Sequence, residues 1–173
     1  EVNALADAAR LVAGPYEGEL VHNAQDTLVV DNAAGVGVLN FIAEVEFCNP
    51  YERELGGWDY GLFFRHEGPN LQYRLAVTSD QLWELSYWDG SENSEASGTA
   101  YMLYVPQGGC NTMHLTVQDD TAHFFLNDEY VTTLDVSKKM VPGDILVVTG
   151  IYTGDEIDGE STTYTDFTVW ELP

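Results

Sequence analysis

The chain has 173 residues, of which 45% are hydrophobic and 12% aromatic, and these fractions exclude an intrinsically disordered chain. Six basic against 29 acidic residues give a formal net charge of −23 at pH 7, so the surface repels phosphate backbones and anionic lipid. Because the apolar runs are also too short to span a bilayer, we expect an acidic globular protein with neither nucleic acid nor a membrane among its partners.

The first predicted element is a short helix over residues 3–12. Asn3 is a suitable N-cap, good helix formers follow it, and Gly14 with Pro15 ends the helical pattern. The sequence therefore predicts a helical segment over residues 1–14 and a second, larger domain over residues 15–173.

From residue 15 onward, apolar residues recur with a period of two, which is typical of β-strands. The alternating or apolar segments are residues 40–47, 58–65, 71–77, 83–88, 115–117, 124–126, 130–134, 145–151 and 164–172. Turn residues at 118–121 and 127–129 indicate tight hairpins, whereas the polar, acidic stretches 90–98 and 153–163 predict surface loops. About ten short strands separated by turns predict an all-β fold, an antiparallel β-sandwich.

The order of these signals resembles the bacterial concanavalin A-like jelly rolls of the lectin/glucanase superfamily, and within it a group of extracytoplasmic domains of unassigned function. The residues that carry the resemblance are Gly18–Leu20, Asn40–Pro50, Trp58–Arg65, Tyr73–Leu75, Asn111, Phe124–Asn127, Gly143–Asp144, Thr149–Gly150, Thr153–Glu156 and Tyr164–Trp170. One departure is Asn127-Asp128, where the family has Asn-Gly. Since Asp tolerates a left-handed backbone, we expect the turn to survive.

The two cysteines, Cys48 and Cys110, each lie at the end of a predicted strand, where pairing across a sheet is geometrically easy. A disulfide and two buried thiols are both compatible with the sequence. If the protein is extracytoplasmic, we expect the disulfide.

Catalytic motifs are weak in this sequence. The glucanases that the chain resembles carry Glu-x-Asp-x-x-Glu on one strand, and this chain lacks that motif. Glu44 and Glu46 are the nearest approach, and we interpret them as a solvated strand face. His114 and His123 flank a hairpin, but two histidines without a third ligand favour a solvent-facing role over a metal site. We therefore expect no catalysis.

A ligand-binding face follows from the alternation in three consecutive segments, if they pair as a meander. Sugar-binding surfaces combine aromatic platforms with planar side chains that hydrogen-bond hydroxyl groups. The side chains opposite the apolar rows are Asp59, Arg65, Gln72, Arg74, Glu84 and Trp88. The alternative is that Arg65, Arg74 and Glu84 form a salt ladder that only supports the sheet. The remaining aromatic residues are predicted to be core, namely Phe41, Phe47, Phe124, Phe125, Phe167 and Trp170.

Calcium is the only cofactor that the sequence suggests. Jelly rolls of this type frequently hold one Ca²⁺, and the resemblance implies Asp166, with Glu19 as a partner. Separately, four carboxylates between Asp155 and Glu160 are hard oxygen ligands of the kind Ca²⁺ prefers, although an acidic loop is usually only solvated.

The function most consistent with these observations is a non-catalytic, carbohydrate-binding-type module that is secreted or displayed at the cell surface. Its expected partners are a polysaccharide or oligosaccharide and other domains of the same protein or assembly. The alternative is a structural or protein-interaction module, and a divergent glycoside hydrolase is least favoured. Adaptation of the source organism to high salt is an alternative explanation of the acidic composition.

Overall fold

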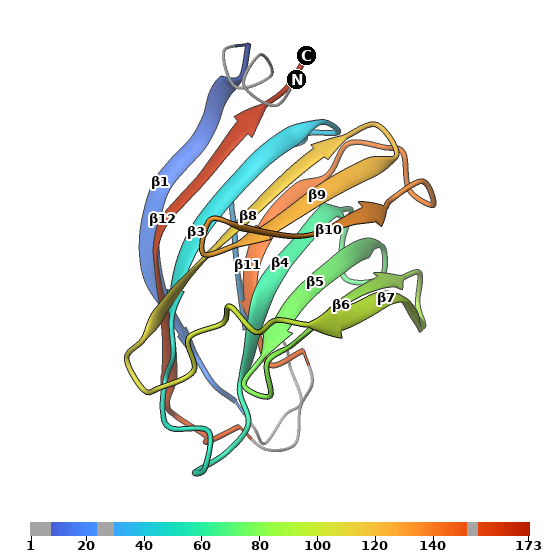
Figure 1. The fold of residues 1–173 in the computed structure, drawn as a ribbon. Helices are drawn as coiled ribbons and strands as arrows, with labels where there is room; N and C mark the ends of the chain where they lie inside the picture. The colour runs from blue at the N-terminus through green and yellow to red at the C-terminus, as the bar shows by residue number, and fades with distance from the viewer. Residues whose placement is uncertain (1–7, 24–29, 152–155) are drawn as a thin grey trace.

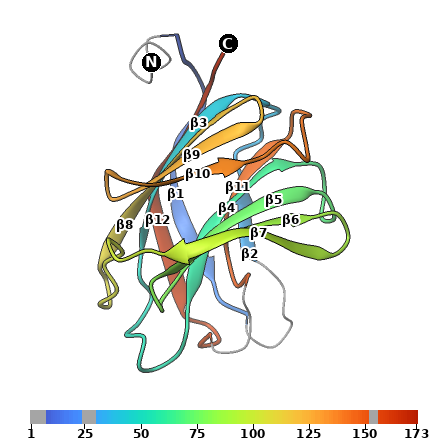
Figure 2. The ribbon, with the colours of Figure 1, turned by 45° about the vertical axis from the view of Figure 1, so that its right-hand side comes forward.

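The computed structural model describes residues 8–23, 30–151 and 156–173. Within these ranges the chain forms twelve strands and no helix. The strands make two six-stranded antiparallel sheets that pack face to face (Figures 1 and 2). The predicted all-β antiparallel sandwich is therefore confirmed. The described part contains no apolar helix of the length that a bilayer crossing requires.

Each sheet joins strands that are distant in the sequence. Sheet I contains, in spatial order, β1 (Arg10–Val21), β12 (Ser161–Glu171), β3 (Phe41–Cys48), β8 (Cys110–Gln118), β9 (Thr121–Leu126) and β10 (Glu129–Asp135). Sheet II contains β2 (Val30–Ala33), β11 (Asp144–Thr149), β4 (Asp59–His66), β5 (Gln72–Thr78), β6 (Leu82–Trp88) and β7 (Glu92–Thr99). Strands β4 to β7 follow one another directly, so the expected meander of β4, β5 and β6 is present.

The prediction of an N-terminal helix is wrong for residues 8–12, the part of it that the structure describes, because no helix is present there. Residues 10–12 open strand β1, which pairs with β12 from Arg10 opposite Glu171 to Val21 opposite Ser161. The strand runs through Gly14 and Pro15, so the predicted boundary between residues 14 and 15 falls inside a strand. A ladder of this length outweighs a helix propensity of a few tenths of a kcal/mol per residue. Residues 3–7 lie outside the described residues.

The stretch 90–98, predicted to be a loop, forms most of β7 instead. This strand pairs with β6 on one side and is the edge of sheet II. Because an edge strand next to solvent needs no apolar row, its sequence shows no alternation.

The core lies between the two sheets and contains most of the predicted aromatic residues. Phe41, Phe47, Phe124 and Phe167 are at most 1% exposed, as predicted. Phe125 and Trp170 are half-buried on the outer side of sheet I, so their assignment to the core is wrong. Each follows a core residue of its strand, and successive side chains of a strand point to opposite faces.

The turn between β9 and β10 keeps its form despite the missing glycine. Asn127 and Asp128 have φ angles of 52° and 64°, the left-handed conformation that a two-residue hairpin turn requires. The Asn127 side chain also fixes the turn, because its Oδ1 accepts a hydrogen bond from the backbone N of Thr112 at 2.9 Å. The expected survival of this turn is confirmed.

Arg65 is the largest fully buried side chain among the described residues. It has a φ of 48°, and the pairing of β4 with β11 shifts register beside it. This irregularity turns the side chain away from the outer face of sheet II, where strict alternation would place it.

The Arg65 guanidinium binds backbone carbonyl groups of three connections at one end of the sandwich. Nη1 donates to the carbonyl oxygens of Val136 at 3.0 Å and Lys139 at 2.7 Å. Nη2 donates to those of Asp119 and Leu39, and Nε also donates to Leu39, at 3.3 Å. Burial lowers the pKa of Arg65, but arginine remains protonated in proteins. A single side chain therefore holds the β2–β3, β8–β9 and β10–β11 connections together.

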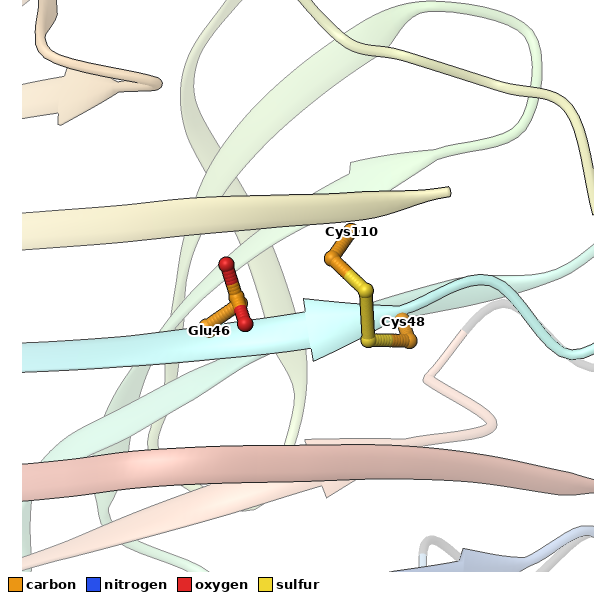
Figure 3. A group of neighbouring side chains, drawn as sticks. All are labelled: Glu46, Cys48 and Cys110. Atoms are coloured by element: carbon orange, nitrogen blue, oxygen red, sulfur yellow. A yellow bond between two sulfur atoms is a disulfide. The ribbon is translucent and has the colours of Figure 1, made fainter. Parts of the chain in front are cut away.

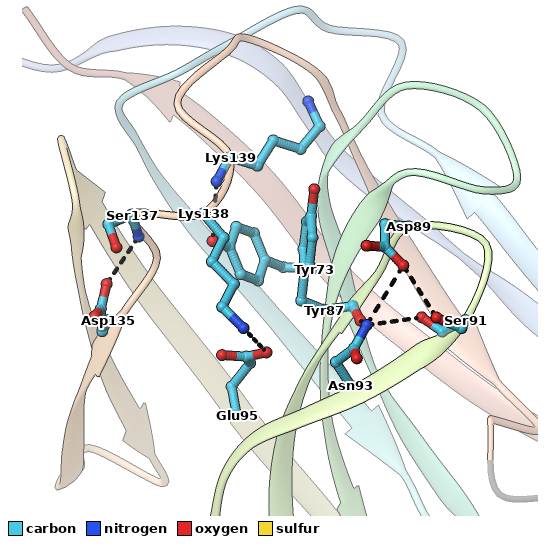
Figure 4. A network of polar contacts seen from close by, with 10 residues as sticks. All are labelled: Tyr73, Tyr87, Asp89, Ser91, Asn93, Glu95, Asp135, Ser137, Lys138 and Lys139. Atoms are coloured by element: carbon cyan, nitrogen blue, oxygen red, sulfur yellow. Dashed lines mark hydrogen bonds and ion pairs between the residues drawn. The ribbon is translucent and has the colours of Figure 1, made fainter.

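The β10–β11 connection is also tied to sheet II (Figure 4). Lys138 Nζ lies 2.6 Å from Glu95 Oε1 on edge strand β7. The backbone N of Lys139 donates to the Tyr73 hydroxyl at 3.2 Å, and its Nζ lies 2.6 Å from Glu67 Oε2. These contacts close one end of the sandwich over the core.

The Arg65 contacts predict a large stability difference between two arginine variants. Arg65→Met should lower the free energy of unfolding by at least about 3 kcal/mol, because buried carbonyl groups lose their donors. The matched control is Arg10→Met, which removes an exposed ion pair with Glu171 and should change stability by about 0.5 kcal/mol or less. Urea unfolding followed by circular dichroism measures both, and equal small losses would contradict the role assigned to Arg65.

Candidate functional site

The outer side of sheet II carries the residues from which a ligand site can be built. We call it the sheet II face. Its members alternate with core residues along three strands: Asp59, Gly61 and Phe63 of β4; Gln72, Arg74, Ala76 and Thr78 of β5; Leu82, Glu84, Ser86 and Trp88 of β6.

Cross-strand pairing arranges this face in four rows. The rows are Gln72–Trp88, Phe63–Arg74–Ser86, Gly61–Ala76–Glu84 and Asp59–Thr78–Leu82. Six residue steps separate Gln72 from Thr78, which is about 20 Å along the strand. Six of the eleven members are buried, so only part of this length is accessible to a ligand; they are Asp59, Gly61, Phe63, Gln72, Ala76 and Ser86.

The row of Gly61 and Ala76 adds little side-chain bulk above the backbone. A Cβ on Gly61 would lie 2.0 Å from the carbonyl oxygen of Leu75, so a larger residue does not fit there without moving β5. Gly61 and Ala76 are both buried, so Glu84 is the accessible member of this row.

Arg74 lies between two aromatic rings. Its Cζ is 4.8 Å from the ring centroid of Phe63 and 4.1 Å from that of Trp88. Both are cation–π distances, and they hold the guanidinium in one place on the face. The Trp88 indole is itself positioned by a long hydrogen bond of 3.5 Å from its Nε1 to Asn70 Oδ1.

A cavity of about 490 Å³ opens at the other end of the face. Its lining combines apolar and polar groups and includes Trp58, Asp59, Thr78, Asp80, Leu82, Glu84 and Thr99. Asp80 is paired with Arg53 at 2.9 Å, and Thr78 Oγ1 is buried without a hydrogen-bond partner among the described residues. Thr99 and Glu84 place a hydroxyl and a carboxylate beside the apolar walls of the cavity, the usual composition of a small-molecule site.

Strand β11 and the residues that follow it position Asp59, which is only 1% exposed. Its Oδ1 accepts a hydrogen bond from the backbone N of Ile151 at 3.0 Å, and its carbonyl oxygen accepts one from Thr149 Oγ1 at 2.6 Å. Thr149 Oγ1 lies 3.5 Å from His22 Nε2, which contacts Thr162 Oγ1 at 2.8 Å. A series of buried polar contacts thus links Asp59, through Thr149 and His22, to Thr162 beneath the wall of the cavity.

Three of the six predicted ligand residues, Asp59, Arg65 and Gln72, are at most 1% exposed. Arg65 is 0% exposed and points to the loops described above, so its assignment to the face is wrong, and so is a salt ladder of Arg65 with Glu84. Gln72 is 1% exposed, and its Nε2 donates to the carbonyl of Pro69 at 3.4 Å. The structure places Arg74, Glu84 and Trp88 half-buried on the face, with Asp59 in the wall of the cavity.

The sequence reasoning missed residues of two kinds. Phe63 and Thr78 alternate with core residues, so the pattern places both on this face, although neither is among the six predicted ligand residues. Asp80 follows β5 in a tight turn in which Gln81 has a φ of 58°. No periodicity extends into that turn, and only the structure brings Asp80 to the cavity.

The two predicted calcium ligands lie on neighbouring strands, at different positions of the β1–β12 pair. Glu19 pairs with Thr163 in the β1–β12 ladder, whereas Asp166 lies in the irregular part of β12 with a φ of 55°. Within the described residues, the one cluster of three metal-ligand side chains is Glu46, Cys48 and Cys110, and a disulfide joins its two cysteines (Figure 3). Asp155 lies outside the described residues, so calcium stays a prediction.

Glu44 and Glu46 lie on the outer side of sheet I rather than near the cavity. Glu44 Oε2 is 3.2 Å from His114 Nδ1, and Glu46 Oε1 accepts a hydrogen bond from Thr165 Oγ1 at 3.4 Å. His123 is opposite Thr116 in the β8–β9 ladder, not opposite His114. We therefore interpret Glu44 and Glu46 as polar side chains on the solvent-facing side of sheet I.

No protein-family model and no curated protein matches this chain. Solved structures do match it. The carbohydrate-binding module CBM66 from Bacillus subtilis is 11% identical, with a TM-score of 0.66 over 94% of each chain. A protein of unknown function with a galectin-like fold, also from Bacillus subtilis, is 16% identical, with a TM-score of 0.65 over 99% of this chain and 92% of that one.

A Bacillus licheniformis β-glucanase is 13% identical, with a TM-score of 0.60 over 96% of this chain and 83% of that chain. Identities this low show the fold. The chain therefore has the concanavalin A-like jelly-roll architecture, a fold that binding modules and glucanases share.

His22 predicts a pH dependence of stability. It is 3% exposed, and burial lowers its pKa from 6.5, an effect that Glu160 partly opposes. The folded state therefore favours neutral His22, while the unfolded chain binds a proton near pH 6.5. The contribution of His22 is complete above that pH and is lost as the pH falls from there towards the lower folded-state pKa.

We expect wild type to lose more unfolding free energy than His22→Gln between about pH 7.5 and about pH 5.5. Urea unfolding at both pH values measures the difference, and titrations at other sites cancel between the two proteins. The matched control is His123→Gln, at a half-buried histidine on the surface that is bonded to Thr133, which should retain the wild-type pH dependence. An equal loss in wild type and His22→Gln would contradict the assignment.

Proposed function

We propose that this chain is a non-catalytic carbohydrate-binding module that binds a neutral oligosaccharide or polysaccharide on the sheet II face. The observation that carries the proposal is Arg74, held between Phe63 and Trp88 on a face that leads into a 490 Å³ cavity. The fold shared with a carbohydrate-binding module adds to its support.

The chemistry of the face suits a sugar. A pyranose ring has an apolar C–H side that packs on an indole, and its rim carries hydroxyl groups. A guanidinium such as that of Arg74 donates hydrogen bonds of the kind that sugar hydroxyls accept, and the Glu84 carboxylate can accept one from a hydroxyl. Each contact contributes about 1 kcal/mol net, so we expect dissociation constants in the micromolar to millimolar range.

The charge of the chain favours a neutral ligand over an acidic one. A net charge of −23 repels uronate and sulfated chains at long range. Near the cavity, the carboxylates of Asp59 and Glu84 would lie next to any anionic group. We therefore infer a neutral sugar, and we infer an extracytoplasmic location from the Cys48–Cys110 disulfide.

The tryptophan prediction uses two variants on opposite sheets. Trp88→Ala should weaken sugar binding by about tenfold or more, because it removes a ring that fixes Arg74. The domain should stay folded, since Trp88 is half-buried and outside the core. Trp170→Ala is the matched control, because Trp170 is also half-buried but lies on the outer side of sheet I. A glycan array followed by calorimetry on the best hit measures both.

The same screen separates the proposal from its alternatives. Equal binding by both variants would overturn the sheet II face as the site, and no binding to any neutral glycan would favour a structural or protein-interaction module. Release of new reducing ends from a bound polysaccharide, lost in Glu84→Gln, would show a hydrolase. Binding that EDTA abolishes would support the calcium prediction.

A further inference from the structure

Glu46, Cys48 and Cys110 lie at the end of sheet I, on the outer side of the sandwich (Figure 3). Cys48 is directly opposite Cys110 in the β3–β8 ladder, and Glu46 is two residues earlier in β3 on the same face. One carboxylate oxygen and the two sulfurs all lie within 4.8 Å of one another. We propose that the reduced form of this chain binds one divalent, thiol-seeking cation of the Zn²⁺ type through these three side chains.

The ligand set fits this class of cation. Two thiolates and one carboxylate suit Zn²⁺, which takes sulfur ligands at about 2.3 Å and carboxylate oxygens at about 2.1 Å in a tetrahedron. Water completes the fourth position. Ca²⁺ and Mg²⁺ require oxygen ligands and do not suit this group. The two thiolates and Glu46 carry three negative charges, in a chain whose net charge already attracts cations.

The three side chains remain together after the S–S bond is broken, because other bonds hold the two strands. The backbone N of Asn49 donates to the carbonyl of Gly109 at 2.9 Å, and the N of Gly108 donates to the carbonyl of Asn49 at 3.1 Å. The Asn49 side chain adds hydrogen bonds of 2.7 Å to the Tyr104 carbonyl and 2.9 Å to the Pro106 carbonyl. Rotation about the Cα–Cβ bonds is then sufficient to open the sulfurs around an ion.

The group is also accessible. Cys110 is exposed, and Glu46 and Cys48 are half-buried at the surface, so both a reductant and an ion can reach them. The Glu46 carboxylate is held at this place by the hydroxyl of Thr165 at 3.4 Å. Such a partner orients a ligand before the ion binds.

The chemistry requires a dithiol as the reductant. The dithiol breaks the S–S bond, supplies two electrons and two protons to the cysteines, and becomes its own disulfide. Binding of Zn²⁺ then forms two Zn–S bonds and releases the two thiol protons to solvent. Because the same sulfur atoms form either the disulfide or the metal bonds, the two states exclude each other, and the bound ion protects the thiols from oxidation.

The test measures metal binding to the whole chain in both redox states. The protein is reduced with excess dithiol, desalted without oxygen and titrated with Zn²⁺ against a chromophoric chelator. Cd²⁺ is titrated in parallel, since its thiolate bonds give an ultraviolet charge-transfer band. We expect one ion per reduced chain, and none for the oxidised chain or for reduced Cys110→Ser.

Two glutamate variants isolate the carboxylate ligand. Glu46→Gln should bind at least about tenfold more weakly. Glu44→Gln, on the same face of β3 but bonded to His114, should bind like wild type. Equal affinities of the two variants, or equal binding by the oxidised and reduced chains, would overturn the site. So would a reduced, metal-free chain that circular dichroism shows to be unfolded, because the strands would then not hold the ligands. None of these outcomes bears on sugar binding.

Discussion

The buried Arg65 guanidinium is the constraint on which one end of the sandwich depends. Removing a charge from water costs several kcal/mol even after relaxation, so it is tolerated only where nearly every N–H group finds an acceptor. The β2–β3, β8–β9 and β10–β11 connections supply those acceptors as backbone carbonyls. The dependence is mutual, because the carbonyls would be buried without donors if Arg65 were absent. Three connections with no sequence similarity to one another are therefore fixed relative to sheet II.

The same residue marks the limit of what alternation can predict. Period-two patterning placed Arg74, Glu84 and Trp88 on the outer side of sheet II, because β5 and β6 pair without irregularity there. The period-two prediction failed at Arg65 because a bulge with a φ of 48° reverses the direction of its side chain. The alternation of apolar and polar residues in β4 gives no sign of this bulge. The one sign elsewhere in the sequence is Gly143, since a Cβ there would lie 2.4 Å from the Arg65 backbone.

Other differences between expectation and structure have one physical origin, namely that pairing with a distant strand outweighs local preference. Residues 10–12 belong to the predicted helix but pair with the last strand of the chain. Strand β7 is polar on both sides and is a strand because β6 offers it a partner. Asp80 reaches the cavity through a turn. The architecture was predictable from periodicity, whereas edges, bulges and turns depend on contacts far apart in the sequence.

The placement of the few cations connects stability with the candidate site. Of the six Lys and Arg residues, Arg10, Arg53, Lys138 and Lys139 pair with carboxylates, and Arg65 binds backbone carbonyls. Arg74 lies between two aromatic rings on the outer side of sheet II. The two rings therefore fix the position of this guanidinium on the sheet, and the proposed sugar site depends on that position because a displaced guanidinium would no longer lie beside the Trp88 indole.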